Sequence, residues 1–221
     1  MSRIVITSDS TATPWIAVIA AARTVLTDNA GKGNALDITL SESFYRLGLI
    51  DAGSAPFTAS ELALVAQHHF RAELGDTCAD CDFRTISLAD NEALLCCAIE
   101  SQGINGLQQA AAAAGFSIRS LRPRLTDLAP PLLRELTVFS GHLVIADART
   151  ALLISLRNGR WLQVMTRRSD PSPDWLATTL DQAETLTGTG SRTVWRAGSM
   201  TPDAVSGWQV RRLDASMGQA A

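Results

Sequence analysis

The chain has 221 residues, of which 46% are hydrophobic and 19% charged, with a formal net charge of −3 and a pI near 5.6. A chain of this length can bury a substantial core, as one large domain or as two compact halves. The acidic balance disfavours a nucleic-acid-binding protein, whose domain is usually basic. No apolar run approaches the roughly 20 residues that span a bilayer.

The first expected elements are a short strand within residues 1–12 and a helix that begins at Pro14. Thr13 is placed to cap this helix, and proline suits its first turn. The apolar run Trp15–Ala22 lacks a basic flank and a cleavage site, so we expect no signal peptide. Residues 27–35 are expected to form a loop, because their Gly-Lys-Gly-Asn lacks the spacing and the Ser/Thr of a Walker phosphate loop.

The middle of the chain combines strand and helix patterns. Residues 36–41 and 44–51 alternate between apolar and polar residues, like two paired strands. Thr58, followed three residues later by Glu61, is a capping box that marks the start of a helix. The apolar face of that helix is Leu62, Val65, Ala66, Phe70 and Leu74. Beyond it the sequence predicts strands at 83–89, 93–100 and 116–124, a helix over 103–115 that ends at Gly115, and a further helix over 128–136.

After Ser140 the scheme begins again. The sequence predicts strands at 142–148, 150–157 and 160–168, a helix over 172–188 capped by Ser172 or Asp174, and closing strands at 192–198 and 208–214. Asn158-Gly159 is a strong signal for a tight hairpin turn between two of these strands. The recurrence predicts an α/β fold of two halves, residues 1–139 and 140–221, each with a mixed sheet flanked by helices.

Four cysteines raise the question of a metal or redox site. Cys78 and Cys81 have the CxxC spacing of many zinc and redox sites. Cys96 and Cys97 are adjacent in an apolar strand, so their side chains point to opposite faces and cannot easily reach one ion. We therefore expect structural thiols and no metal site, with a Cys78–Cys81 disulfide as the open alternative.

No set of residues has the spacing of a catalytic centre. His68 and His69 are adjacent in a helix and do not share a face, and His142 has no evident partner. The Gly-x-Ser-x-Gly nucleophile elbow and the Gly-x-Gly-x-x-Gly dinucleotide motif are missing from the sequence. No pair of acids suggests acid–base catalysis. We therefore predict no catalytic residue, no cofactor-binding residue and no metal ligand.

Several stretches resemble a known family. "LDITLSESFYRLGLID" (36–51), "HHFRAELGD" (68–76) and "LLCCAIESQGINGLQQAAAAAGFSIRSLRPRL" (94–125) are similar to PilM/GspL/MshI-type proteins of type IV pilus and type II secretion systems. "LVIADARTALLISLRNGRWLQVMTRR" (143–168) resembles the second half of those proteins. The resemblance covers roughly residues 36–187 and implies an actin-like (RNase H-like) fold.

The same resemblance indicates where phosphate-binding residues have been lost. Actin-like ATPases hold phosphate with Asp-x-Gly hairpins, but the N-terminal stretch here is Asp9-Ser10-Thr11, without a glycine. In the second hairpin Asp147 is followed by Arg149, where a glycine would stand, and by Thr150. A side chain at this position obstructs close approach of the backbone to a phosphate, although an arginine can itself contact one. A trimmed, non-catalytic member is therefore expected, and an ATPase with altered hairpins is the alternative.

The role that the resemblance implies is assembly. PilM-like proteins bind the cytoplasmic tail of a PilN-type membrane protein, and GspL-like proteins hold a secretion ATPase at the inner membrane. The chain is accordingly expected to be a cytoplasmic scaffold that such a partner recruits to the inner membrane, without inserting into it. A strand with Phe44, Tyr45 and Arg46 is a candidate wall of the docking groove. Its two aromatic side chains are expected on opposite faces, one in the core and one exposed to a ligand. An α/β domain of unrelated function is the third interpretation.

Overall fold

The computed structural model describes residues 2–6, 14–28, 35–51, 53, 57–88, 93–126, 138–147, 149–170, 172–197 and 203–212. The chain divides into two compact units, Met1–Pro123 and Arg124–Ala221. The boundary expected from the sequence, between residues 139 and 140, lies further along the chain. Most of the residues between the two boundaries are outside the described ranges, as are the helix expected at 128–136 and the cap expected at Thr13.

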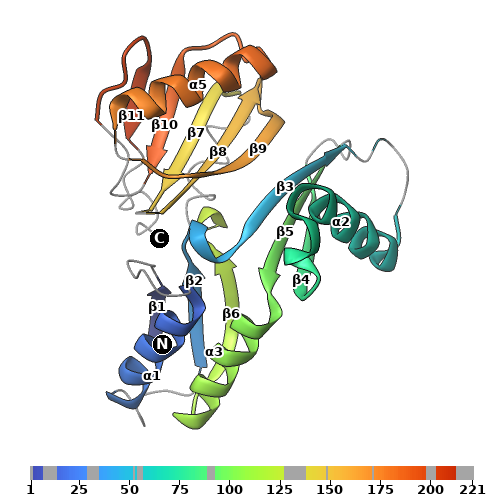
Figure 1. Ribbon diagram of the computed structural model, residues 1–221, viewed down its shortest axis with the longest axis vertical. Coiled ribbons are helices and arrows are strands. Elements are labelled where there is room, and N and C mark those ends of the chain that lie inside the picture. The colour runs from blue at the N-terminus through green and yellow to red at the C-terminus, as the bar shows by residue number, and fades with distance from the viewer. Residues whose placement is uncertain are drawn as a thin grey trace. The chain divides into compact units, whose positions relative to one another are not determined.

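The first unit contains a parallel sheet of three strands. β1 (Ser2–Ile6), β2 (Ala35–Leu40) and β6 (Ser117–Pro123) lie in the order β1-β2-β6, and both pairings are parallel. Helices α1 (Pro14–Asp28) and α3 (Ser101–Ala113) pack against each other beside this sheet (Figure 1). The parallel β1–β2 pair requires a crossover connection, and α1 provides it.

A buried carboxylate links β2 to β6. Asp37 accepts hydrogen bonds from Arg119 Nε at 3.0 Å and from Ser120 Oγ at 2.6 Å, and Arg119 Nη2 also contacts it. The hydrogen bonds from Arg119 and Ser120 lower the pKa of Asp37 against the opposing effect of desolvation. All three residues lie at the irregular step in the β2–β6 register, which begins at Leu36/Asp37. The ion pair is therefore part of the sheet's architecture.

The first unit also contains an antiparallel sheet, so its described strands form two sheets and not the single mixed sheet expected for residues 1–139. β3 (Arg46–Asp51), β4 (Cys81–Ser87) and β5 (Ala93–Glu100) lie in the order β3-β5-β4. Helix α2 (Ala59–Leu74) covers one face of this sheet. The predicted capping box is confirmed, because Thr58 Oγ1 accepts from the Glu61 N–H and Glu61 Oε2 accepts from the Thr58 N–H at 2.7 Å. Phe70, on the buried face of α2, is fully buried, and its ring stacks on that of Phe83 with centroids 5.9 Å apart.

The expectation that residues 36–41 and 44–51 pair with each other is wrong. β2 pairs with β1 and β6, whereas β3 pairs with β5, in a different sheet. The 3₁₀ helix η1 (Glu42–Phe44) separates the two strands. It turns the chain out of the parallel sheet before the next strand begins, so the alternation in the sequence identified two strands but not their partners.

The second unit is built on one mixed sheet of five strands. β7 (Gly141–Ala146), β8 (Thr150–Arg157), β9 (Arg160–Arg168), β10 (Thr193–Ala197) and β11 (Gln209–Arg212) lie in the order β11-β10-β7-β8-β9. The pairs β7–β8 and β8–β9 are antiparallel, and β10 is parallel to both of its neighbours. The predicted turn between β8 and β9 is confirmed: Asn158 and Gly159 both have positive φ, 50° and 76°, as a type I′ turn requires.

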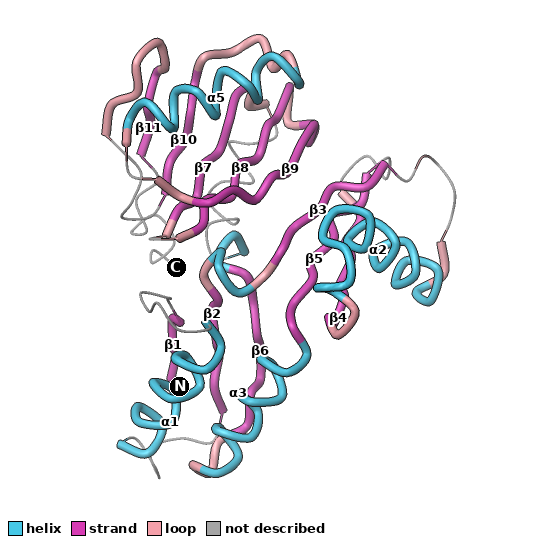
Figure 2. Tube along the Cα trace, in the orientation of Figure 1, coloured by secondary structure: helices cyan, strands magenta, loops and turns pink. Residues whose placement is uncertain are grey.

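Helix α5 (Pro173–Thr187) covers one face of this sheet. It runs across the strands in Figure 2 and packs Leu176 and Leu180 against Val144, Leu153 and Val194. Ser172, and not Asp174, caps the helix, because its Oγ accepts from the Trp175 N–H at 3.1 Å. In the described parts of the chain, no helix is both long enough and apolar enough to cross a membrane.

Substitution of Gly103 is expected to destabilise the first unit. A Cβ at this position of α3 would lie 2.1 Å from the buried ring of Trp15 in α1. Overpacking of this kind costs about 1–3 kcal/mol, more than the roughly 1 kcal/mol that alanine gains over glycine in a helix. Urea unfolding of Gly103→Ala should therefore show a lower midpoint than the parent chain.

Gly106→Ala is the matched control, one turn further along the same helix. A Cβ there meets Cδ1 of the half-buried Ile19, the far end of a flexible side chain. We expect this variant to be as stable as the parent or slightly more stable. Equal stability of the two variants would show that Trp15 does not hold the α1–α3 packing in place.

Candidate functional site

The first candidate site is the turn between β7 and β8, where the sequence places Asp147, Arg149 and Thr150. Asp147 is buried at the end of β7, and its Oδ1 accepts from the Arg149 N–H at 2.8 Å and from the Thr150 N–H at 2.7 Å. The Asp147 N–H donates to the Thr150 carbonyl at 2.9 Å. The Arg149 side chain is exposed. The turn is thus closed by the carboxylate of its own first residue.

This closure bears on phosphate binding. A backbone phosphate cradle needs N–H groups that point toward the anion. Here two N–H groups of the turn already donate to a carboxylate, which also carries the same charge as a phosphate. The N-terminal stretch Asp9-Ser10-Thr11, the other hairpin of the sequence argument, lies outside the described residues.

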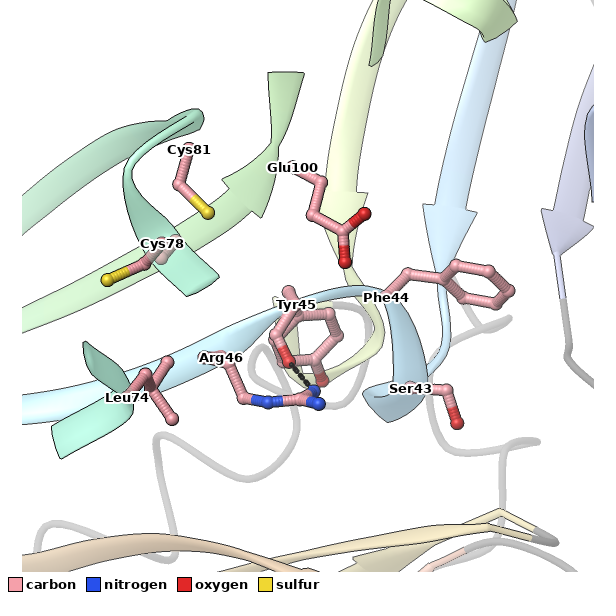
Figure 3. A pocket seen from close by; sticks show the side chains of 9 residues that line it. Ser43, Phe44, Tyr45, Arg46, Leu74, Cys78, Cys81 and Glu100 are labelled. Atoms are coloured by element: carbon pink, nitrogen blue, oxygen red, sulfur yellow. Dashed lines mark hydrogen bonds between the residues drawn. The ribbon is translucent and has the colours of Figure 1, made fainter. Parts of the chain in front are cut away.

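The second candidate site is a cavity of about 280 Å³ within the first unit. It lies between the start of β3, the ends of α2 and β5, and the short 3₁₀ helix η2 (Gly75–Cys78) that leads into β4. Its lining residues are Ser43, Phe44, Tyr45, Arg46, Leu74, Cys78, Cys81, Ala98 and Glu100. Figure 3 shows the Glu100 carboxylate and the Cys81 thiol extending toward the space beside Tyr45 and Arg46.

The residues expected to wall a docking groove do line this cavity, but not as predicted. Phe44 and Tyr45 were expected on opposite faces of a strand, with one of them exposed. Both are buried, at 3% and 2% exposure. Phe44 ends η1, where a 3₁₀ turn replaces the alternation of a strand, and its ring packs edge-on against Trp15 with centroids 5.0 Å apart. Tyr45 donates its hydroxyl to Glu42 Oε1 at 3.3 Å, so neither aromatic ring is free to meet a ligand.

The chemistry of the cavity comes from its charged and small residues. Arg46 is half-buried, and its Nη1 donates to the Tyr45 carbonyl at 2.9 Å, which fixes the guanidinium beside the cavity. Glu100 is exposed at the end of β5. Leu74 and Ala98 add apolar surface to the lining. The cavity therefore combines apolar side chains with one cationic and one anionic side chain.

All four cysteines are free thiols. Cys78 is buried and donates from Sγ to the Gly75 carbonyl at 3.3 Å. Desolvation raises the pKa of Cys81, with a further contribution from Cys78, and raises the pKa values of Cys96 to about 11 and Cys97 to about 12. At neutral pH Cys81, Cys96 and Cys97 are thiols, not the thiolates that bind metals and attack disulfides.

We predict that purified protein contains no stoichiometric zinc. Among the described residues, no group of three or more His, Cys, Asp or Glu side chains is placed to hold a metal ion. Elemental analysis of protein prepared without chelator tests this. One zinc per chain, lost in Cys81→Ser but retained in the control Cys96→Ser, would contradict it.

A buried polar network in the second unit was missed by the sequence argument. His142 had no evident partner there, but its Nδ1 lies 2.9 Å from Ser155 Oγ and its Nε2 lies 3.2 Å from Glu184 Oε2. Glu184 also accepts from the N–H groups of Thr189 at 3.1 Å and Gly190 at 2.9 Å. The register Ser155↔His142 across β7–β8 puts the first two residues side by side, and this register was not available from sequence spacing.

These residues include a serine, a histidine and an acid, yet they do not form a hydrolytic triad. In such a triad histidine Nε2 faces the serine and Nδ1 faces the acid, which is the reverse of the order here. Ser155 and His142 are 1% and 0% exposed, so no substrate can reach the hydroxyl. The carboxylate of Glu184 instead fixes the loop Gly188–Ser191 between α5 and β10.

Burial sets the charge state of this network. Desolvation lowers the pKa of His142 below its usual 6.5, against the opposing effect of Glu184. Desolvation acts to raise the pKa of Glu184, but hydrogen bonds from Thr189, Gly190 and His142 outweigh it, and the net shift is downward. At neutral pH the pair is a neutral imidazole and a carboxylate. Since the carboxylate only accepts, Nε2 carries the ring hydrogen and Nδ1 accepts from Ser155.

The adjacent histidines of α2 do not act together. His68 is exposed, whereas His69 is half-buried with its Nε2 3.5 Å from Glu73 Oε1, one turn along the same helix. Their side chains leave the helix in different directions, as expected for neighbours in sequence.

No protein-family model matches the sequence, and no curated protein matches it. Solved structures do match. A chain of the "PilM-PilN type IV pilus biogenesis complex" superposes with a TM-score of 0.67 and 12% identity, over 96% of this chain and 79% of that chain. The cytoplasmic domain of EpsL, an inner membrane component of the type II secretion system of Vibrio cholerae, gives a TM-score of 0.56 and 14% identity, over 95% and 86% of the two chains.

A third matching structure is described as having an actin-like ATPase fold. A protein of unknown function with an actin-like ATPase fold, from Bacteroides thetaiotaomicron, gives a TM-score of 0.52 and 8% identity, over 80% of this chain and 67% of that chain. At these identities the similarity establishes architecture. The fold class predicted from the sequence is confirmed: the chain has an actin-like α/β fold and is similar in structure to the PilM-PilN complex chain and to the cytoplasmic domain of EpsL.

Proposed function

We propose that the chain is a non-catalytic scaffold of a type IV pilus or type II secretion system, which docks a short cytoplasmic segment of an inner-membrane component. The observation that carries this proposal is the cavity of the first unit, which is lined by apolar side chains together with Arg46 and Glu100. Two matched structures support the setting. One is a PilM-PilN complex, and the other is a cytoplasmic domain of an inner membrane secretion component.

The cavity suits part of a peptide better than a whole metabolite. Its volume of about 280 Å³ lies at the lower limit of small-molecule pockets, which span roughly 300–1,000 Å³. An apolar side chain can contact Leu74 and Ala98, and polar groups of the same segment can pair with Arg46 and Glu100. Fixed charges of opposite sign also set the direction in which a segment lies. A PilN-like tail is the occupant we favour, and a segment of a secretion ATPase is the second choice.

The turn at Asp147 supports the non-catalytic part of the proposal. Its carboxylate accepts from two N–H groups of the turn, the turn to which the family resemblance assigns phosphate binding. These bonds support a hairpin that serves as a structural turn. The actin-like ATPase alternative rests on the shape of this hairpin and on the retention of Asp147 and Thr150.

Calorimetric titration with Mg-ATP separates the two. We predict no heat of specific binding up to millimolar nucleotide, because the Asp147 carboxylate occupies the donors that a phosphate would need. The control is Arg149→Gly, which restores the glycine of the motif and leaves the carboxylate in place. A micromolar dissociation constant for the parent chain would contradict the scaffold proposal and make Asp147 and Thr150 candidate nucleotide contacts.

A tail-capture panel tests the docking itself. The full chain is immobilised and exposed to synthetic cytoplasmic tails of the pilus and secretion membrane proteins encoded by the same organism. We expect one tail to bind with a dissociation constant of about 100 micromolar or lower, equivalent to about −5.5 kcal/mol. If every tail fails at millimolar concentration, the scaffold proposal loses its support.

A further inference from the structure

The outer edge of β9 is an unpaired sheet edge of the second unit. β9 is the last strand in the order β11-β10-β7-β8-β9, so its outer edge pairs with no strand in the described chain. It is nine residues long, which exceeds the usual strand length of five to six residues. Residues 161–166 are only half-buried. A long edge strand of this kind is a template on which another strand can pair.

The hydrogen-bond phase of β9 follows from one bond beyond its end. The Ser169 N–H donates to the Arg149 carbonyl at 2.9 Å, which makes Arg149/Ser169 a hydrogen-bonded pair in the β8–β9 register. Bonded and non-bonded pairs alternate in antiparallel sheets. With Ala151↔Arg167 and Leu153↔Met165 in register, Arg167 and Met165 bond to β8.

The residues between them face the other way. Val164, Thr166 and Arg168 direct their backbone N–H and C=O groups away from β8, toward the outer edge. The register irregularity between Ser155 and Leu156 interrupts the pairing before Gln163. The regular part of the edge is therefore Gln163–Arg168. Its outward backbone N–H and C=O groups belong to Val164, Thr166 and Arg168.

The charge of this edge specifies its partner. The strand sequence "RWLQVMTRR" contains three arginines and no acidic residue. Arg167 and Arg168 are exposed, and no carboxylate of the described residues forms an ion pair with either of them. Arg167 Nη2 lies 3.6 Å from Met165 Sδ. The nearest acid in sequence, Asp170, accepts from the Ser172 N–H at 2.8 Å instead.

A second copy of the chain is a poor occupant. Pairing two β9 strands would gather six arginines and no carboxylate from the strands along one seam, since each strand brings three. Like charges at this spacing oppose pairing, whereas acidic side chains on an incoming strand would meet Arg167 on one face of the sheet and Arg168 on the other.

We propose that the edge of β9 binds an extended acidic segment of another protein, which adds to the sheet as a sixth strand. Backbone bonds to Val164, Thr166 and Arg168 would supply affinity, and the arginines would supply selectivity for acidic side chains. This surface belongs to the second unit, and its residues do not line the cavity of the first. A negative result for one proposal therefore does not affect the other.

The test uses the full chain and two labelled eight-residue peptides. One alternates glutamate with threonine, and the other alternates lysine with threonine. Thr166→Pro removes an outward N–H at an edge position, where proline is tolerated, and Thr166→Val keeps that N–H as the matched control. Arg167→Glu/Arg168→Glu reverses the charge without touching the backbone, and it keeps the test decisive if the proline variant fails to fold.

Fluorescence anisotropy should show binding of the glutamate peptide that is at least tenfold tighter than that of the lysine peptide. Thr166→Pro and the double glutamate variant should each weaken binding at least tenfold, while Thr166→Val should not. Equal affinity for both peptides, no binding of either at millimolar concentration, or unchanged affinity in Thr166→Pro would overturn the proposal. A peptide-free dimer in analytical ultracentrifugation that Thr166→Pro converts to a monomer would also overturn it, since the occupant would then be a second copy.

Discussion

Replacement of Glu184 by alanine is expected to destabilise the second unit by about 3–5 kcal/mol. The carboxylate accepts from His142 Nε2, from the Thr189 N–H and hydroxyl, and from the Gly190 N–H. His142 and Thr189 are buried, so their donors would lose their partner in a place that water does not easily reach. Each unsatisfied buried donor costs roughly 1–3 kcal/mol, and the losses are not additive. Denaturant unfolding followed by tryptophan fluorescence measures the change.

Two variants test the cause of that loss. Glu184→Gln keeps an oxygen that accepts from the loop and should retain most of the stability. Asp181→Ala is the control on the same helix. Its exposed carboxylate pairs with the exposed Arg192 and accepts from Trp208 Nε1 at 3.3 Å, so the variant loses a surface ion pair, which contributes about 0–1 kcal/mol, and one long hydrogen bond. A loss in Glu184→Ala no larger than that in Asp181→Ala would mean that the network does not hold the loop.

Asp147→Ala is expected to destabilise the second unit by about 2–4 kcal/mol. Its carboxylate is buried and accepts from the N–H groups of Arg149 and Thr150. Without it, the turn between β7 and β8 loses the acceptor of two donors, and Thr150 is itself buried. Thermal unfolding of the variant should show a clearly lower midpoint.

Asp147→Asn distinguishes a structural acid from a ligand. Asparagine keeps the oxygen that accepts both N–H groups, and Asn tolerates such turns well, so we expect a loss below about 1 kcal/mol. An acid that served to hold a cation or nucleotide would show the opposite pattern, with little effect on folding in either variant. Equal stability of Asp147→Ala and the parent chain would contradict the structural role.

Local signals in the sequence predicted the elements well. The capping box at Thr58/Glu61 and the Asn158-Gly159 turn depend on neighbours a few residues apart, and both are confirmed. The two α/β halves followed from the recurrence of these signals. Ser172 could not be separated from Asp174 as a cap, because the choice depends on which side chain reaches the Trp175 N–H.

Pairing between distant segments was harder to predict from the sequence. β2 and β3 were expected to pair, but the short η1 helix between them sends each strand to a different sheet. The same 3₁₀ turn buried both Phe44 and Tyr45, where a strand would have exposed one. A three-residue 3₁₀ turn has no strong sequence signature, so its consequences could not be anticipated.

The candidate sites show the same division. The altered hairpin at Asp147–Thr150 was identified from its residues, and the structure adds how the carboxylate closes it. The strand around Arg46 was a candidate groove wall from the sequence, and it does line a cavity. The lining residues Cys81 and Glu100 could not be predicted with it, because they come from segments 35 or more positions later in the sequence. The contact between His142 and Glu184 likewise joins residues 42 positions apart.

Docking in the cavity of the first unit is the central claim, and a single substitution tests it most directly. Glu100 is exposed at the cavity, and its side chain forms no capping bond to α3. Glu100→Trp should therefore fill the opening without unfolding the chain. Gln109→Trp places the same ring on the exposed face of α3, the helix that follows Glu100, and Gln109 is not a lining residue.

The measurement is calorimetric titration of the parent chain and both variants with the membrane-protein tail that the chain captures. The account predicts that the parent and Gln109→Trp bind with equal affinity, at about 100 micromolar or tighter, and that Glu100→Trp binds at least tenfold more weakly. Equal affinity of all three proteins, with the fold intact by circular dichroism, would place the tail elsewhere and contradict the assignment of the cavity as the docking site.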